Sequence, residues 1–187
     1  MEKNVLTGDR LVVDKFVFAA GGGPLAPMLP ARPVRRGDLL VFRYPEDPRR
    51  AFLKRVIGLP GETVVIRDKQ VTVDGRPLEE PWAFHADDTT WPDDPSVPET
   101  HRRRDQLPLV RVPPRAYFVL GDNRDDSSDS RYWGPVPADH VLGRPLFVYW
   151  SIRPRGTGTA SGPAAWLRLP ADLVRRTRWD RLFRPVR

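Results

Sequence analysis

The sequence predicts a mainly β fold, and three observations lead to that expectation. Proline is unusually frequent, with 22 residues among 187, and 14 glycines add further turn positions. Because proline lacks a backbone N–H and interrupts helices, this composition favours short strands over long helices. Short runs of β-branched and aromatic residues recur between the turn residues, as in antiparallel sheets. A chain of this length is expected to bury one main core.

Three strands are expected in the first third of the chain, each preceded by a polar turn. They cover residues 11–18, 39–42 and 51–58. The third is apolar at most positions but contains Lys54.

The next expected element is a hairpin, in which residues 63–66 pair with residues 70–73 around a polar turn. Two further strands are expected at residues 116–120 and 146–150. A polar loop rich in acids, arginines and hydroxyl groups, residues 121–134, follows the first of these two strands directly. Polar loops held by rigid strands often carry function.

The domain organisation is expected to be simple. Residues 1–151 would form the main domain, with residues 82–114 as an irregular surface insertion whose Arg102, Arg103 and Arg104 form a solvated face. Residues 152–163 read as a flexible link. The basic amphipathic tail, residues 164–187, is expected either to pack as a terminal element or to lie on an anionic membrane surface.

Charge and composition narrow the function classes. The formal net charge of +7 comes mainly from arginine and suits nucleic acid, anionic lipid or solubility. The arginines are spread along the chain, so we expect no nucleic-acid partner. The absence of cysteine excludes disulfides and thiolate metal sites. No segment has the length of a membrane span or the pattern of a signal peptide.

Lys54 and the polar loop each allow two interpretations. Burial in an apolar strand would lower the pKa of the Lys54 amine, so that the neutral amine acts as a general base near neutral pH. Alternatively, the lysine extends to solvent or pairs with an acid. Residues 121–134 form either a site or a hydrogen-bonded connector with an internal ion pair.

Four segments, in this order, resemble the type I signal peptidases, which are membrane-bound serine endopeptidases with a Ser/Lys dyad. Residues 121–134, GDNRDDSSDSRYWG, match the most distinctive box of that family, and residues 52–62 match its lysine box. Residues 8–16 and 36–42 resemble the segment after its nucleophile and the next strand. The resemblance covers residues 1–151 and implies a signal-peptidase-like antiparallel β-sheet or barrel fold.

The resemblance also implies residue roles. Lys54 would be the general base, Ser127 would orient its amine, and Asp129 with Arg131 would form the ion pair that fixes the loop. Three residues of the box would shape the loop: Asp122, Asn123 and Arg124.

Substrate binding and cellular setting follow from the same resemblance. Phe52 and Leu53 would flank a groove in which the end of a signal peptide adds as a strand, and Met1 would stand in the substrate-binding region. The implied reaction removes signal peptides from secreted preproteins at the extracytoplasmic face of the cytoplasmic membrane, with a membrane surface as a further partner. No cofactor or metal is implied.

One element of the family pattern is outside this chain. The nucleophilic serine precedes a methionine that corresponds to Met1, so it is expected just upstream, together with the oxyanion-hole groups and the membrane anchor. Either the chain continues upstream of Met1, or it is a catalytically dead peptide-binding domain. A repressor-type self-cleaving Ser/Lys protease is a further alternative, although the helix-turn-helix segment it needs is not evident.

Overall fold

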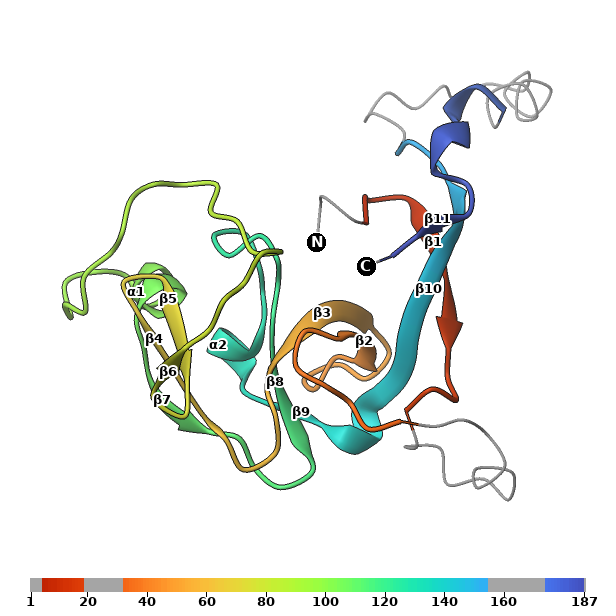
Figure 1. Cartoon of the computed structure of the whole chain (residues 1–187). Helices are drawn as coiled ribbons and strands as arrows, with labels where there is room; N and C mark the ends of the chain where they lie inside the picture. Colours follow the sequence, from red (N-terminus) through yellow and green to blue (C-terminus); the bar gives the residue numbers. More distant parts are fainter. Residues whose placement is uncertain (1–4, 19–31, 155–173, 187) are drawn as a thin grey trace. The chain divides into compact units, whose positions relative to one another are not determined.

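The computed structural model describes residues 5–18, 32–154 and 174–186. Two compact units divide the chain: one contains Asp14–Arg144, and the other combines Glu2–Val13 with Pro145–Arg187. In chain order, the elements labelled in Figure 1 and the short 3-10 helices η2 and η4 are β1 (Asp9–Asp14), β2 (Leu39–Arg43), β3 (Ala51–Gly58), β4 (Thr63–Arg67), β5 (Gln70–Val73), β6 (Arg76–Pro77), α1 (Glu99–Asp105), β7 (Leu107–Arg111), β8 (Ala116–Leu120), α2 (Ser130–Trp133), β9 (Val136–Pro137), η2 (Ala138–His140), β10 (Val141–Ser151), η4 (Trp179–Arg181) and β11 (Arg184–Pro185).

Antiparallel pairing dominates the larger unit, which confirms the predicted mainly β class. The strands β2, β3, β8 and β9 lie next to one another in that order, and the start of β10 pairs with the other edge of β2. A second, four-stranded sheet has the order β6-β5-β4-β7.

The predicted hairpin is present as β4 and β5, with Val64 opposite Val73. Asp68 and Lys69 at its turn both adopt positive φ angles, of 49° and 67°. Two-residue turns with this backbone match the right-handed twist of the flanking strands, which explains why a short polar turn is enough here. The strands predicted at residues 51–58 and 116–120 coincide with β3 and β8.

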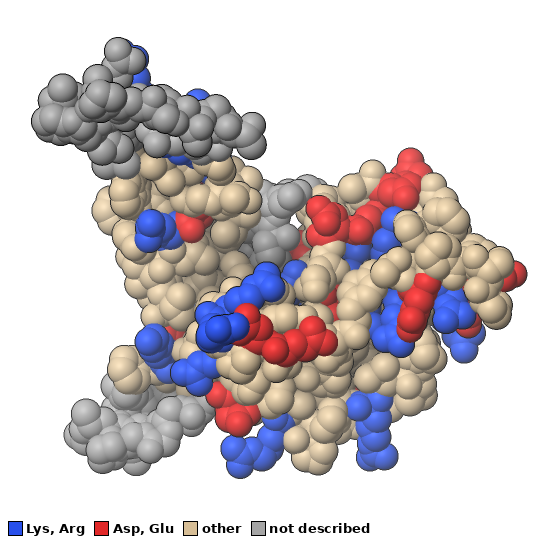
Figure 2. Space-filling model, turned by 180° about the vertical axis from the view of Figure 1, so that it is seen from behind, with Lys and Arg blue, Asp and Glu red and all other residues tan. Residues whose placement is uncertain are grey.

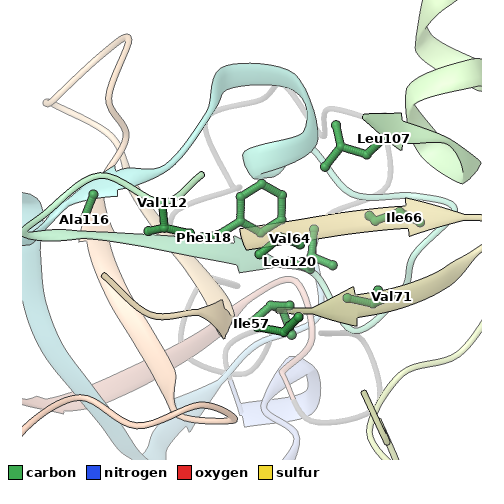
Figure 3. Packing of buried hydrophobic residues seen from close by; sticks show 10 residues of the cluster. Ile57, Val64, Ile66, Val71, Leu107, Val112, Ala116, Phe118 and Leu120 are labelled. Carbon is green, nitrogen blue, oxygen red and sulfur yellow. The ribbon is translucent and has the colours of Figure 1, made fainter. Parts of the chain in front are cut away.

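One face of β3 packs on a core shared by both sheets. Ile57, Val64, Phe118 and Leu120 are completely buried in it, and Figure 3 shows them meeting from β3, β4 and β8. The other face of β3 contributes Val56 to a second cluster, with Leu40 and Phe42 of β2. Since side chains alternate along a strand, Phe52, Lys54 and Val56 share this second face.

The span 82–114, expected to be irregular, contains regular structure. It includes α1, and its strand β7 extends the smaller sheet, with Val110 opposite Val64. Arg104 also differs from the expected solvated face, because its side chain is only 9% exposed and donates to the buried carboxylate of Asp105. The span is therefore irregular only in part, and it is bonded to the rest of the unit.

Strand β1 ends earlier than predicted, at Asp14. The Asp14 carboxylate accepts hydrogen bonds from the backbone N–H groups of Phe16 and Val17, at 2.8 and 3.2 Å. Such an aspartate turn satisfies the backbone locally and ends strand pairing.

The smaller unit contains β1, the second part of β10 and the end of the chain. Phe147 and Val148 of β10 pair with Pro185 and Arg184 of β11, and the buried Arg181 donates to the carboxylate of Asp9. The described end of the tail is thus a packed terminal element. Of the predicted flexible link at 152–163, residues 155–163 lie outside the described residues, whereas Ile152 pairs with Thr177. The first part of the tail also lies outside the described residues.

The surface charge is mixed. Figure 2 shows basic and acidic side chains interspersed on one face of the molecule. Ion pairs such as Arg32 with Asp38 and Arg36 with Glu62 account for part of this mixture. Among the helices of the described residues, none is both long and apolar enough to cross a membrane.

Candidate active site

The amine of Lys54 emerges from the middle of β3, beside the loop that follows β8. Its nitrogen donates a hydrogen bond of 2.7 Å to the Ser127 hydroxyl oxygen. Burial lowers the pKa of the Lys54 amine below the ordinary value of 10.5, and the nearby Asp129 carboxylate opposes this shift without cancelling it. Because a lysine with a lowered pKa is partly neutral nearer physiological pH, it has the lone pair that a general base needs.

Gly121 permits the contact between Lys54 and Ser127. A Cβ atom placed on Gly121 would lie 2.2 Å from the Ser127 hydroxyl oxygen, 2.7 Å from its Cβ atom, and 3.4 Å from the Lys54 nitrogen. The first two distances are far below van der Waals contact. Only glycine at this position lets Ser127 approach the amine, a function that the sequence-based roles do not assign.

Asp129 and Arg131 form a buried, bidentate ion pair, with side chains 0% and 1% exposed. Arg131 donates to the two carboxylate oxygens through Nε and Nη2, both at 2.9 Å. Burial raises the pKa of Asp129, but the Arg131 charge and hydrogen bonds from Arg131, Gly121 and Ser127 outweigh it, so the net shift is downward. Asp129 therefore stays ionised and holds the Ser127 hydroxyl.

The Asp129 carboxylate also organises the backbone of the loop. It accepts from the Gly121 N–H at 3.0 Å and, as the N-cap of α2, from the Arg131 N–H. The next residue, Ser130, accepts from the Val119 N–H of β8 at 3.0 Å. These bonds tie the start and the end of the loop to the same strand.

Of the three expected loop-shaping side chains, those of Asp122 and Arg124 bond outside the loop, and that of Asn123 bonds within it. Asp122 accepts two hydrogen bonds, of 2.8 and 3.0 Å, from the buried Arg55 guanidinium of β3. Arg124 pairs with Glu80 and donates to the Gly121 carbonyl. Asn123 accepts from the Asp126 N–H at 3.4 Å. Asp122 and Arg124 thus fasten the loop to β3 and to the segment before α1.

The remaining donor of Arg131 reaches the segment that contains α1. Its Nη1 donates to the Arg104 carbonyl at 2.9 Å, and Nη2 also donates to the Arg124 carbonyl at 2.7 Å. The sequence does not predict this link, because the acceptor is a backbone carbonyl group, which every residue type carries. The α1 segment therefore supports the ion pair beside Lys54.

Phe52 and Leu53 precede Lys54 on β3, where one edge of the strand is open. On the β2 side, pairing runs along the whole segment, with Arg43 opposite Ala51. On the β8 side, pairing begins only at Arg55, opposite Leu120. The backbone from Ala51 to Lys54 thus presents an edge without a partner strand among the described residues. Met1 lies outside those residues.

Phe52 packs in an aromatic cluster. Its ring stacks on Tyr44, with centroids 4.6 Å apart, and meets Phe42 edge-on at 6.4 Å. Leu53, by alternation, points to the opposite face of β3 and lies opposite Val41. No cluster of three or more acidic or histidine side chains is positioned for a metal ion in the part of the chain that the structure describes.

A buried lysine of lowered pKa, hydrogen-bonded to a serine beside an open strand edge, is the kind of site in which a neutral amine can act as a base. Residues 1–150 match the family model described as "Signal peptidase, peptidase S26". The chain therefore belongs to the signal peptidase family of peptidase S26.

Individual relatives agree with this assignment. A signal peptidase I from Leptolyngbya laminosa is 36% identical over 155 residues, which cover 79% of this chain and 63% of that protein. One from Pseudomonas aeruginosa is 32% identical over 177 residues, covering 81% and 62%. The chain thus spans slightly less than two thirds of the length of these relatives. A crystal structure of a signal peptidase I from Enterococcus faecalis aligns with a TM-score of 0.46 at 34% identity, covering 60% of this chain and 97% of that one.

Proposed function

We propose that this protein is a signal peptidase I, which removes signal peptides from secreted preproteins at the extracytoplasmic face of the cytoplasmic membrane. The observation that carries the proposal is the 2.7 Å hydrogen bond from the buried Lys54 amine to Ser127. A lysine of lowered pKa is costly to maintain, and it suits general-base catalysis near neutral pH. Family membership supplies the reaction type.

The proposed reaction uses Lys54 twice. A serine directly before Met1, where the family resemblance expects it, attacks the carbonyl carbon of the scissile peptide bond, and the neutral Lys54 amine takes the hydroxyl proton. The protonated lysine then gives this proton to the departing amine, leaving an acyl-enzyme. Water hydrolyses the ester in the reverse sequence, again through Lys54.

The supporting residues orient the Lys54 amine and favour its neutral form. Ser127 accepts its hydrogen bond, and Asp129 holds Ser127 in turn. Arg131 offsets the charge of Asp129, which would otherwise favour the protonated amine. These three residues are proposed as positioning residues, with Lys54 as the residue that transfers the proton.

The open edge of β3 supports the proposed binding mode. An extended peptide that pairs with Ala51–Lys54 gains backbone hydrogen bonds, which do not depend on its amino-acid sequence. Pockets for its side chains would then select small residues. The side chain of Phe52 lies on the same face of the strand as Lys54, so it would contact alternate substrate residues.

The test compares the chain carrying a serine-containing segment before Met1 with its Lys54→Ala variant, on a preprotein in membrane vesicles. We expect cleavage after a small residue, and loss of cleavage in the variant. Cleavage that is indifferent to Lys54 would contradict the dyad. Tight binding of signal peptides with no cleavage by the serine-containing protein would instead favour a peptide-binding domain.

A further inference from the structure

Arg50 lies directly before β3, the strand that carries Lys54 of the proposed site. Its carbonyl accepts a 2.8 Å hydrogen bond from the Tyr44 N–H, which continues the ladder between β2 and β3 by one residue on each strand. Because side chains alternate along a strand, Arg50, Phe52 and Lys54 share one face. By the rise of a β-strand, Arg50 lies about 13 Å along the edge from Lys54.

Two aromatic rings hold the Arg50 guanidinium. Its central carbon lies 5.2 Å from the centre of the Phe52 ring and 5.7 Å from that of Tyr44. The two rings are themselves stacked at an interplanar angle of 18°. A guanidinium within about 6 Å of a ring centre is attracted to the ring face, so this cation occupies a defined place.

The neighbouring carboxylates are engaged by other groups. Asp47 accepts from Arg49 at 3.0 Å, and Glu46 accepts from the Tyr44 hydroxyl. Within the described residues, Arg50 itself forms no ion pair. Among the described residues, the turn between β2 and β3 thus presents a cation in a defined place, without an ion-pair partner, next to the open edge of β3.

We propose that Arg50 is a specificity-determining residue that favours a carboxylate on the fifth substrate residue before the scissile bond. This inference rests on the proposed function. If the last residue before the scissile bond lies opposite Lys54, the third residue before it lies opposite Phe52 and the fifth opposite Arg50, all with side chains on one face. Aspartate or glutamate at that fifth position would meet the guanidinium.

The experiment measures affinity, so it does not need the nucleophile. Fluorescent peptides carry alanine at the first and third positions before the cleavage site, and aspartate, asparagine or lysine at the fifth. Fluorescence anisotropy gives their dissociation constants with this chain. We expect aspartate to bind about two- to fivefold more tightly than asparagine, and lysine more weakly, as for solvent-exposed ion pairs. The preference should shrink at about 0.5 M salt.

Arg50→Glu tests the assignment, because it should invert the order of aspartate and lysine. The matched control is Arg49→Glu, which makes the same change of charge one residue away at a side chain that is 91% exposed. We expect it to leave the order intact. Each comparison is a ratio within one variant, so the fraction of folded protein cancels.

Three outcomes separate this inference from the proposed function. Equal affinities for the three peptides, or an equal effect of Arg49→Glu, would overturn the role of Arg50 and leave the proposed function standing. If none of the peptides binds and the serine-containing protein cleaves no preprotein, the proposed function fails and the inference with it. An order that inverts only in Arg50→Glu supports both.

Discussion

The side-chain amine of Lys54 and the hydroxyl of Ser127, 73 residues apart in sequence, are joined by a hydrogen bond of 2.7 Å. The amine comes from the middle of β3, and the hydroxyl comes from the loop after β8, which pairs with β3. The register of these two strands therefore sets the geometry of the proposed base.

Replacing Lys54 with methionine tests the role of the amine. Since general-base catalysis contributes about a hundredfold to ten-thousandfold, kcat/KM for preprotein cleavage should fall by this factor in the serine-containing protein. In the parent protein, kcat/KM should rise with pH on a limb whose midpoint lies below 10.5, because only the neutral amine accepts the proton. The exposed Lys15→Met is the control, and an equal loss there would contradict a specific role.

The same substitution should change the pH dependence of stability. The folded pKa of Lys54 lies below its unfolded value, so the unfolded state binds more protons between the two pKa values. The free energy of unfolding should therefore rise with pH across that window, up to about pH 10.5. Urea denaturation of the chain at several pH values measures this slope, which should be smaller in Lys54→Met. An identical slope would show that the amine is not desolvated.

Ser127→Ala removes the acceptor that aims the amine and a donor to Asp129. We expect cleavage to fall about a hundredfold, the scale of a misplaced catalytic group, while the free energy of unfolding drops by about 1 kcal/mol. Steady-state kinetics and urea denaturation on the same samples separate the two effects. Ser96→Ala, in an exposed turn, should leave both unchanged. A loss of stability without a loss of kcat would make Ser127 a structural residue only.

Gly121→Ala should impair cleavage by displacing Ser127, because the new methyl group would lie 2.2 Å from the serine oxygen. Kinetics and thermal unfolding provide the measurement. Gly75→Ala is a useful comparison, since this position has φ of 73° and no atom within 4 Å of the added carbon. That change should cost about 1 kcal/mol of backbone strain and leave kcat unaffected. Wild-type kcat in Gly121→Ala would refute the steric argument.

Arg131→Met should destabilise the chain by about 3–5 kcal/mol at neutral pH, because it leaves the buried Asp129 carboxylate without its cation. The parent gains stability from the lowered pKa of Asp129 above pH 3.8, and loses it as pH falls through the folded pKa. The difference in the free energy of unfolding between parent and variant should therefore become smaller at low pH. Urea denaturation at two pH values measures it.

The double variant Asp129→Leu, Arg131→Met provides the control for this pair. Removing both charges should destabilise the chain less than removing Arg131 alone. If the double variant lost as much free energy of unfolding as the two single variants together, the two side chains would be energetically independent.

Several features were predictable from residue patterns alone. Short runs of β-branched and aromatic residues between dense turn residues led to the mainly β class and to the bounds of β3 and β8. The box at residues 121–134 and the lysine segment pointed to the family, because their residue types and order are specific. The predictions were less accurate where polar side chains compete with strand pairing, as at Asp14, and where a polar segment packs through backbone bonds, as at Arg104.

The sequence by itself determined which chemical groups are available: a lysine inside an apolar strand, a serine and an aspartate–arginine pair in one polar loop, and a glycine at the start of that loop. Only the tertiary structure decided how they meet. Antiparallel pairing of β3 with β8 brings the amine to the loop, the missing Cβ of Gly121 sets how close Ser127 comes, and burial lowers the pKa of Lys54. These effects depend on distance and solvent exclusion, which arise only when segments remote in sequence pack together.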